Sequence, residues 1–318
     1  MAFDGNTWLT YMLFSCIALV AFLGNALVLY VLLTRPFYLK HPYNVFIFSL
    51  AVADITTAIM LIFSRYLYLP ATPGSGVPRE IYCKAIWAAW ILFTLGYISI
   101  YTCLALTVER WLAVVKPQVY QAITPPEAIK AVIVVWLWGI AINVTTLFRV
   151  KFSDQKRQCT WTALAVGNDE FPWMDFTLQS IIPFVSMVIL YGHILYTMKK
   201  MPFVDGESKT LRKITKVALA ASLAIIVGWL PSRVTFMLSK YAIVDANGQF
   251  HFWLVMLAFA NSCVNPFLYG IYSSQFRKEY KEIFAWVFRF RAALHHRRES
   301  TSTDQTSAPS NGSTSTQL

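Results

Sequence analysis

The chain has 318 residues, of which 57% are hydrophobic and 14% are charged. Soluble proteins usually carry about 25% charged residues, so this composition excludes an ordinary soluble domain. The net charge of +11 does not indicate nucleic-acid binding, because the basic residues fall in short gaps between apolar runs and form no basic domain.

Seven apolar runs are long enough to cross a bilayer, which takes about 20 residues each. They cover residues 9–33, 43–69, 81–115, 128–148, 171–198, 217–238 and 250–272. Seven buried helices of a soluble protein would need more polar surface than this chain offers. The predicted fold class is therefore an all-α membrane protein, a seven-transmembrane helix bundle that forms one domain over residues 9–272.

The Lys and Arg residues predict how the bundle is oriented. Most of the 27 lie in connections on one side, including "KTLRKITK" ahead of the sixth run. Basic residues concentrate in cytoplasmic loops, so we expect an extracellular N-terminus (residues 1–8) and a cytoplasmic C-terminus. The expected location is the plasma membrane, with several spans.

Two segments follow the seventh run. In residues 273–290 the apolar side chains recur at helical spacing, which predicts an amphipathic eighth helix lying on membrane lipid. Those side chains are Phe276, Tyr280, Ile283, Phe284 and Val287. Residues 291–318 are rich in Ser and Thr without apolar periodicity, and we expect a disordered cytoplasmic tail.

The connection after the fourth run predicts a β-hairpin. "FRVKF" alternates apolar and basic residues, and "RQCTWTA" follows a polar turn at Ser153–Lys156. Cys159 lies in this hairpin and Cys83 opens the third run, both on the oxidising side, so we expect a disulfide between them. The alternative is two free thiols.

The polar residues within the runs form a pattern with one motif in each helix. The motifs are, in order, "GNALVL" with Asn25, "SLAVAD" with Asp54, "ERW" from Glu109, Trp136, Pro183 with Tyr191, "GWLP" with Trp229 and Pro231, and "NPFLY" with Asn265, Pro266 and Tyr269. With these motifs the chain resembles the rhodopsin-like (class A) G-protein-coupled receptors, most closely their neuropeptide receptor group. Trp111, Gly228 and Ile225 depart from the residues usual in that family.

The resemblance implies a switch and a coupling surface at the cytoplasmic end. The expected switch residues are Glu109, Arg110, Tyr191, Trp229, Pro231, Asn265, Pro266 and Tyr269. Arg110 pairs with Glu109 at rest and meets Tyr191 and a heterotrimeric G protein when the sixth helix moves. Residues 211–216 contain no acid to hold Arg110, so we predict ligand-free activity. The prolines could equally serve packing alone, and the basic charges could reflect topology alone.

Asp54 lies in the middle of a span, where an unpaired carboxylate is expensive. The resemblance implies an allosteric sodium site built by Asp54, Ser99, Asn261 and Asn265, with Asn25 as a further oxygen donor. Otherwise we expect no cofactor. A protonated Asp54 in a hydrogen-bond network is the other interpretation. Both interpretations tie four helices together.

The outer halves of the helices predict the ligand site. Its expected residues are Arg65, Leu92, Phe93, Gly96, Asp175, Gln179, Trp229, Arg233 and Phe236. The arginines favour a ligand with a carboxylate or another anion, although Arg233 and Asp175 could form an internal ion pair. Leu92 stands where amine receptors carry Asp, and residues 250–272 contain no Lys for a retinal Schiff base.

We therefore expect a receptor that binds an extracellular neuropeptide and activates a G protein. A receptor for a small anionic metabolite or lipid is the alternative, and a seven-helix transporter is a remote one. No catalytic constellation is visible, so we expect no enzyme. Phosphorylation of the tail by receptor kinases would suit arrestin, although the tail could be a linker only, and the end at Leu318 fits a PDZ ligand.

Overall fold

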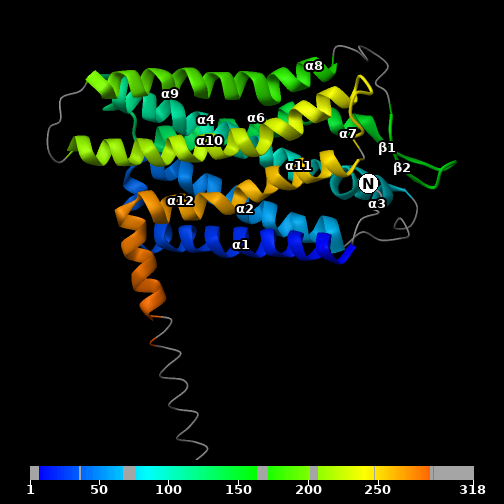
Figure 1. Ribbon diagram of the computed structural model, residues 1–318, viewed down its shortest axis with the longest axis horizontal. Coiled ribbons are helices and arrows are strands. Elements are labelled where there is room, and N and C mark those ends of the chain that lie inside the picture. The colour runs from blue at the N-terminus through cyan, green and yellow to red at the C-terminus, as the bar shows by residue number, and fades with distance from the viewer. Residues whose placement is uncertain are drawn as a thin grey trace, which may run out of the picture. The chain divides into compact units, whose positions relative to one another are not determined.

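The seven expected spans are present as helices in the computed structural model of the chain (Figure 1). The structure describes residues 7–35, 37–66, 76–162, 171–200, 207–246, 248–286 and 289. It divides into two units, Met1–Ser273 and Ser274–Leu318. The first unit holds all seven spans, which confirms the predicted seven-transmembrane bundle.

Within the described residues the spans are built from ten α-helices. They are α1 (Thr7–Thr34), α2 (Pro42–Tyr66), α4 (Trp90–Val115), α6 (Pro125–Ile142) with α7 (Thr145–Arg149), α8 (Phe171–Phe176) with α9 (Ile182–Lys200), α10 (Glu207–Ser239), and α11 (Gln249–Ala260) with α12 (Val264–Tyr272). Short helices α3 (Val77–Ile81) and α5 (Pro117–Tyr120) and a 3-10 turn (Tyr38–Lys40) lie between them.

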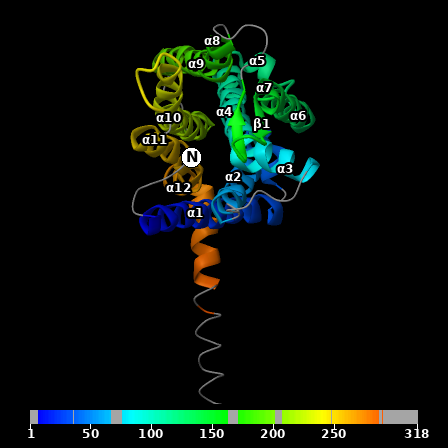
Figure 2. The same cartoon turned by 90° about the vertical axis from the view of Figure 1, so that its right-hand side faces the viewer.

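Helix α4 lies at the centre of the bundle. It packs against α2, α6, α9 and α10, and the end-on view in Figure 2 shows these helices around it. Within its apolar window 67% of the residues are buried, against 17% in the span through α6. Residues such as Val134 and Leu137 of α6 are more than half exposed, as expected for side chains that face lipid.

The third span begins later than the sequence predicts. Instead of one helix over residues 81–115, the chain forms α3, then a π-helical segment (Tyr82–Trp87), and restarts at Trp90. The break is at Ala89, whose φ of 53° is left-handed. Such a residue cannot continue a right-handed helix, and outside glycine the conformation costs about 1 kcal/mol.

Each proline within a span leaves a backbone carbonyl without its usual donor, because proline has no N–H to donate. At Pro266 the freed acceptor is the carbonyl of Ser262, and the Nδ2 of Asn25 donates to it at 2.9 Å from α1. A 3-10 turn (Asn261–Cys263) precedes this bend. Pro183 similarly follows a π-helical segment (Thr177–Ile181).

A two-stranded antiparallel hairpin leaves the bundle after α7. Strand β1 (Val150–Ser153) pairs with β2 (Gln158–Trp161), with Phe152 opposite Cys159, so the predicted hairpin is confirmed. The predicted disulfide Cys83–Cys159 ties β2 to the π-helical segment after α3. We call this end of the bundle the hairpin end.

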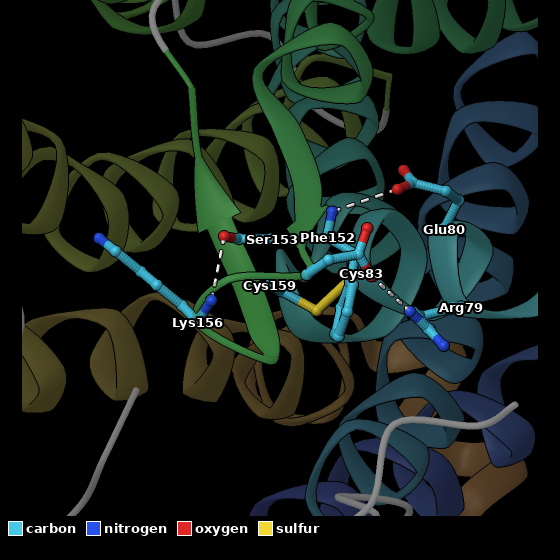
Figure 3. A network of polar contacts seen from close by, with 8 residues as sticks. Arg79, Glu80, Cys83, Phe152, Ser153, Lys156 and Cys159 are labelled. Carbon is cyan, nitrogen blue, oxygen red and sulfur yellow. Dashed lines mark hydrogen bonds and ion pairs between the residues drawn. A yellow bond between two sulfur atoms is a disulfide. The ribbon is translucent and has the colours of Figure 1, made fainter. Parts of the chain in front are cut away.

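Polar contacts hold the other strand of the hairpin (Figure 3). The carboxylate of Glu80 accepts the backbone N–H of Phe152 at 3.1 Å. Arg79 stacks over the Phe152 ring at 4.3 Å and forms a 3.0 Å ion pair with Asp154. Helix α3 therefore anchors the hairpin independently of the disulfide.

The second unit was predicted to begin with an amphipathic helix over residues 273–290. Residues 274–286 are helical, and Lys278 and Glu282 lie one helical turn apart with 3.9 Å between Nζ and Oε1. Residues 1–6, 291–318 and Leu318 with its PDZ motif lie outside the described residues, so the predictions for both ends of the chain stay predictions.

Candidate functional site

A buried arginine surrounded by aromatic rings forms the core of the site near the hairpin end. Arg233 lies two positions after Pro231 in α10 and is only 7% exposed. Its guanidinium carbon lies 5.0 Å from the ring centres of Phe93 and Tyr97 and 5.4 Å from that of Trp229. Three cation–π contacts therefore stabilise a charge that is otherwise removed from water.

The hydrogen bonds of Arg233 are incomplete. One Nη1 donates to the Oε1 of Gln179 in the π-helical segment before α9, at 3.3 Å. The Nε is buried and has no hydrogen-bond partner. Buried cations are normally paired with an anion, so this guanidinium retains both charge and an N–H for a further acceptor.

Asp175 does not form the ion pair with Arg233 that was considered from the sequence, although the two charges are close enough to interact. Its carboxylate instead lies 3.6 Å from the guanidinium of Arg149, at the end of α7. Arg149 was not predicted as a site residue, because the sequence assigned it to the hairpin stretch "FRVKF". Burial and the neighbouring Arg149 lower the pKa of Lys240, the next cation along this rim.

Gly96 lies under the Trp229 indole, in a position that the sequence assigned to the ligand. A Cβ at residue 96 would stand 2.1 Å from the ring atom Cη2 of Trp229. Glycine is therefore required here for the close approach of the ring to α4. The indole also packs edge-on against Phe259, with 5.7 Å between ring centres.

The other predicted ligand residues are dispersed around this core. Leu92 is buried in α4, and Phe93 packs against both Trp229 and Phe259. Phe236 lies a turn farther toward the hairpin end, between His251 and the ammonium of Lys240. Arg65 lies in the last turn of α2, and its side chain is outside the described residues.

A second polar cluster surrounds Asp54 in the middle of the bundle. Its carboxylate is 1% exposed and accepts a hydrogen bond from the Nδ2 of Asn265 at 2.8 Å. Asn265 thus meets Asp54 as a donor, although the sequence assigned it as an oxygen ligand. The Oδ1 atoms of Asn25 and Asn261 are buried without partners, and Ser99 is buried in α4.

The unpaired oxygen atoms around Asp54 are of the kind that a sodium ion would need as ligands. A hard cation takes oxygen ligands, and the cluster offers the Asp54 carboxylate with the unpaired amide oxygens of Asn25 and Asn261. The donor set therefore fits sodium. Asn265 fits less well, since its NH2 group faces the carboxylate.

The opposite end of the bundle, which we call the Arg110 end, carries a three-residue polar cluster. Arg110 forms a two-pronged pair with Glu109, and both are buried. The hydroxyl of Tyr120, on α5, donates to Glu109 at 2.7 Å and accepts from Arg110 at 3.0 Å. Burial, with the Glu109 carboxylate beside it, raises the pKa of Tyr120 to about 12, so the hydroxyl remains protonated at neutral pH.

Tyr191 does not contact Arg110 in this arrangement. Its hydroxyl lies 3.2 Å from the Oγ of Ser222 in α10, and the same Oγ lies 3.3 Å from the Thr107 hydroxyl in α4. Ser222 therefore joins three helices. The sequence interpretation missed it, although a hydroxyl among apolar residues in a span is a signal of this kind.

The remaining switch residues lie between these clusters. Pro231 is inside α10, whereas Pro266 and the buried Tyr269 belong to α12. The side chain of Pro266 packs against Gly24, where a Cβ would approach within 2.8 Å. The predicted residues of the third, sixth and seventh helices are thus distributed along the inside of the bundle.

The chain is thus a bundle of seven membrane-spanning helices with buried polar clusters at one end, in the middle and at the other end. Residues 24–269 match the family described as 7 transmembrane receptor (rhodopsin family). The chain therefore belongs to the rhodopsin-like, class A G-protein-coupled receptors. Membership confirms the resemblance at the level of the class, and members of this family are receptors rather than enzymes.

Proposed function

We propose that the chain is a plasma-membrane receptor for an extracellular neuropeptide and that it activates a heterotrimeric G protein. The observation that carries the ligand assignment is Arg233, a buried cation that forms no ion pair with a carboxylate of the described residues and whose Nε has no hydrogen-bond partner. A ligand that brings a carboxylate or another strong acceptor to its Nε would complete the site. Charge-assisted hydrogen bonds of this kind are about twice as strong as neutral ones.

The hairpin favours a peptide over a small molecule. Its outward residues Lys151, Lys156 and Arg157 are exposed, and Trp161 is 55% exposed beside them. This surface is basic and aromatic, and a ligand of several residues could contact it as well as Arg233. A small anionic metabolite or lipid is the second candidate, because Arg233 alone would satisfy it.

The Arg110 end supports G-protein coupling. Glu109 and Tyr120 hold Arg110, and within the described part of the chain no acidic residue of α10 pairs with it. The side chain of Arg212 in α10 instead donates to the Met198 carbonyl of α9. Movement of α10 would therefore not have to break an ion pair with Arg110, and the basic surface suits the acidic end of a Gα subunit.

Regulation is proposed at two further places. Sodium at Asp54, held with the amide oxygen of Asn261, would favour the resting bundle by binding it preferentially. In residues 291–318, receptor kinases and arrestin remain the proposed partners, with a PDZ domain at Leu318. We further propose that the hairpin end lies outside the cell and the Arg110 end lies in the cytoplasm.

The test begins with a library of peptides and metabolites screened on cells that carry a promiscuous G-protein reporter. For each hit, we expect Arg233→Ala to lower agonist potency about 10-fold to 100-fold, since a hydrogen bond to a charged group contributes about 1.5–3 kcal/mol. Lys130→Ala is the control for the loss of a basic side chain, because Lys130 is exposed and lies near the start of α6 rather than at the hairpin end.

Surface expression separates function from folding in this test. Equal losses of potency and surface expression in Arg233→Ala would mean that the arginine is structural. The hairpin variant Lys156→Ala distinguishes the two ligand classes: a peptide should lose potency, whereas a small anion held at Arg233 should not.

A further inference from the structure

Three cations lie around one carboxylate at the hairpin end. Arg149 ends α7, Arg233 lies in α10, and Lys240 directly follows α10. Asp175, in α8, forms its ion pair with Arg149 at 3.6 Å and interacts with Arg233 and Lys240 at longer range. No other carboxylate of the described residues forms an ion pair with these cations. The cluster therefore carries two positive charges more than its own carboxylate neutralises.

The cations lie at two depths along one face of α10. Arg233 and Lys240 are seven residues apart, which is about two turns, or about 10 Å, along a helix. The Lys240 ammonium lies 4.6 Å from the ring centre of Phe236, which stands between the two cations on this side of the helix. The Arg233 guanidinium is directed toward Phe93 of α4. The site thus offers an inner and an outer positive position.

The outer position is open to solvent. Lys240 is exposed, and the side chains of Arg149 and Asp175 are 20% and 15% exposed. Desolvation and the positive charge of Arg149 lower the pKa of the Lys240 ammonium, so the two cations are close enough to repel each other. An anion placed between them would relieve that repulsion.

The inner position is enclosed and suits the end of a ligand. Arg233 is only 7% exposed, and one turn farther into the bundle the ring of Trp229 covers Gly96 of α4. A ligand chain that enters from the hairpin end would therefore end at Arg233. The anionic group at the end of a peptide is its C-terminal carboxylate.

We propose that the ligand carries two acidic groups about 10 Å apart, an inner one at Arg233 and an outer one between Arg149 and Lys240. An extended peptide advances about 3.3 Å per residue, so three residues span this distance. The ligand class is therefore a peptide with a free C-terminal carboxylate and an Asp or Glu three residues before it. This inference rests on the proposed peptide site at Arg233 and names the chemistry of its ligand.

Other ligands match this arrangement of charges less well. Phosphate or a short dicarboxylate holds its charges close together and would reach only one of the two positions. A peptide with an amidated end would leave the Arg233 guanidinium without an acidic partner. If Lys240 were only a solvated surface cation, a second acidic group in the ligand would gain nothing there.

The test uses the full-length receptor, purified in nanodiscs, and pools of N-acetylated tetrapeptides with a free C-terminal carboxylate. In one pair of pools the first residue is fixed as Glu or as the uncharged Gln, which has nearly the same shape, and the other three residues are randomised. In a second pair the third residue, next to the end, is fixed in the same two ways. Binding is measured as the rise in the thermal unfolding temperature of the receptor with increasing pool concentration.

The pool with Glu at the first residue should reach half-maximal stabilisation at about one fifth of the concentration that its Gln pool needs, a modest factor because the outer cations are partly solvated. This gain should shrink at high salt. Glu at the third residue should give no gain, since it falls short of the outer position. Lys240→Gln should remove the gain and leave the affinity for the Gln pool unchanged, whereas Lys240→Arg should retain the gain.

Lys84→Gln is the matched control, because it removes another positive charge at the hairpin end, one that lies 3.7 Å from Glu80, and should leave the gain unchanged. Equal binding of the Glu and Gln pools, or a full gain in Lys240→Gln, would overturn the second acidic group and leave the Arg233 site standing. Pools with an amidated end test Arg233 separately: they should bind more weakly, and equal binding would overturn the inner position. If no pool binds, the peptide site and this inference both fail.

Discussion

Ser222→Ala should raise the ligand-free activity of the receptor. In the present arrangement Arg110 is still paired with Glu109, and we interpret it as the resting state. Ser222 then holds α10 to Thr107 of α4 and to Tyr191 of α9, through contacts of 3.3 and 3.2 Å. Alanine removes both contacts from the resting state and releases the Tyr191 hydroxyl for Arg110.

The size of the effect follows from these two contacts. Each is a neutral hydrogen bond of ordinary or long length, and such bonds contribute about 0.5–1 kcal/mol net. Together they contribute about 1–2 kcal/mol, or about a 5-fold to 30-fold change in the ratio of open to resting receptor. With an open fraction of about 1% in the wild type, a tenfold shift raises that fraction to about 9%.

The assay is the ligand-free signal of the G-protein reporter, divided by surface expression. The wild type itself should signal above an empty-vector control, since no acidic residue of α10 within the described residues holds Arg110. Thr215→Val is the matched control, because Thr215 is a buried residue of the same helix whose hydroxyl has no partner. If Thr215→Val raises the signal as much as Ser222→Ala, or if neither raises it, the three-helix contact does not restrain α10.

Three further predictions concern other parts of the bundle. Asp54→Asn should abolish any sodium dependence of agonist affinity, because the carboxylate is the only charged group in that cluster of described residues. Cys83→Ser, Cys159→Ser and the double variant should lose the same stability, since either change breaks the one bridge. Gly96→Ala should lower the thermal stability of the purified receptor by about 1–3 kcal/mol, because its Cβ would overlap the Trp229 ring.

For each of these three predictions, one result would contradict it, and the cysteine and glycine predictions also have a control variant. Unchanged sodium sensitivity in Asp54→Asn would eliminate the proposed sodium site. Cys16→Ser should behave as wild type, because Cys16 is a free thiol, and additive losses in the cysteine variants would argue against the bridge. Gly192→Ala should be neutral or stabilising, since a Cβ there meets nothing within 4 Å, and an equal loss at both glycines would refute the steric account.

The seven-helix bundle was largely predictable from the sequence. Each membrane span follows from its own long apolar run and does not depend on contacts with the other spans. The hairpin and its disulfide were predictable for a similar reason: alternation in "FRVKF" and the position of Cys159 are local signals. The break in the third span at Ala89 was not predictable. Nothing in the surrounding apolar run distinguishes an alanine with a left-handed backbone from a helical one.

For the candidate ligand site, the sequence could predict which residues take part but not which of them pair. Pairing depends on the distances between helices, which the sequence does not give. Asp175 and Arg233 share the hairpin end of the bundle, but Arg149 is the cation that lies within 4 Å of the Asp175 carboxylate. Helical spacing placed Gly96 on the inner face of its helix correctly, yet could not show that the Trp229 ring would cover it. Tyr120 lies on α5, in a connection where no helical periodicity could assign it to Arg110.

The hydrogen bond from Asn25 to the Ser262 carbonyl links the first helix to the seventh span. Because Pro266 cannot supply an N–H, the backbone of the seventh span is completed by a side chain of another helix. A movement of α12 at this proline would have to break the hydrogen bond from Asn25 or carry α1 with it. Helix α1, which otherwise only crosses the membrane, would therefore take part in a movement of the seventh span, because it supplies the hydrogen bond that Pro266 cannot.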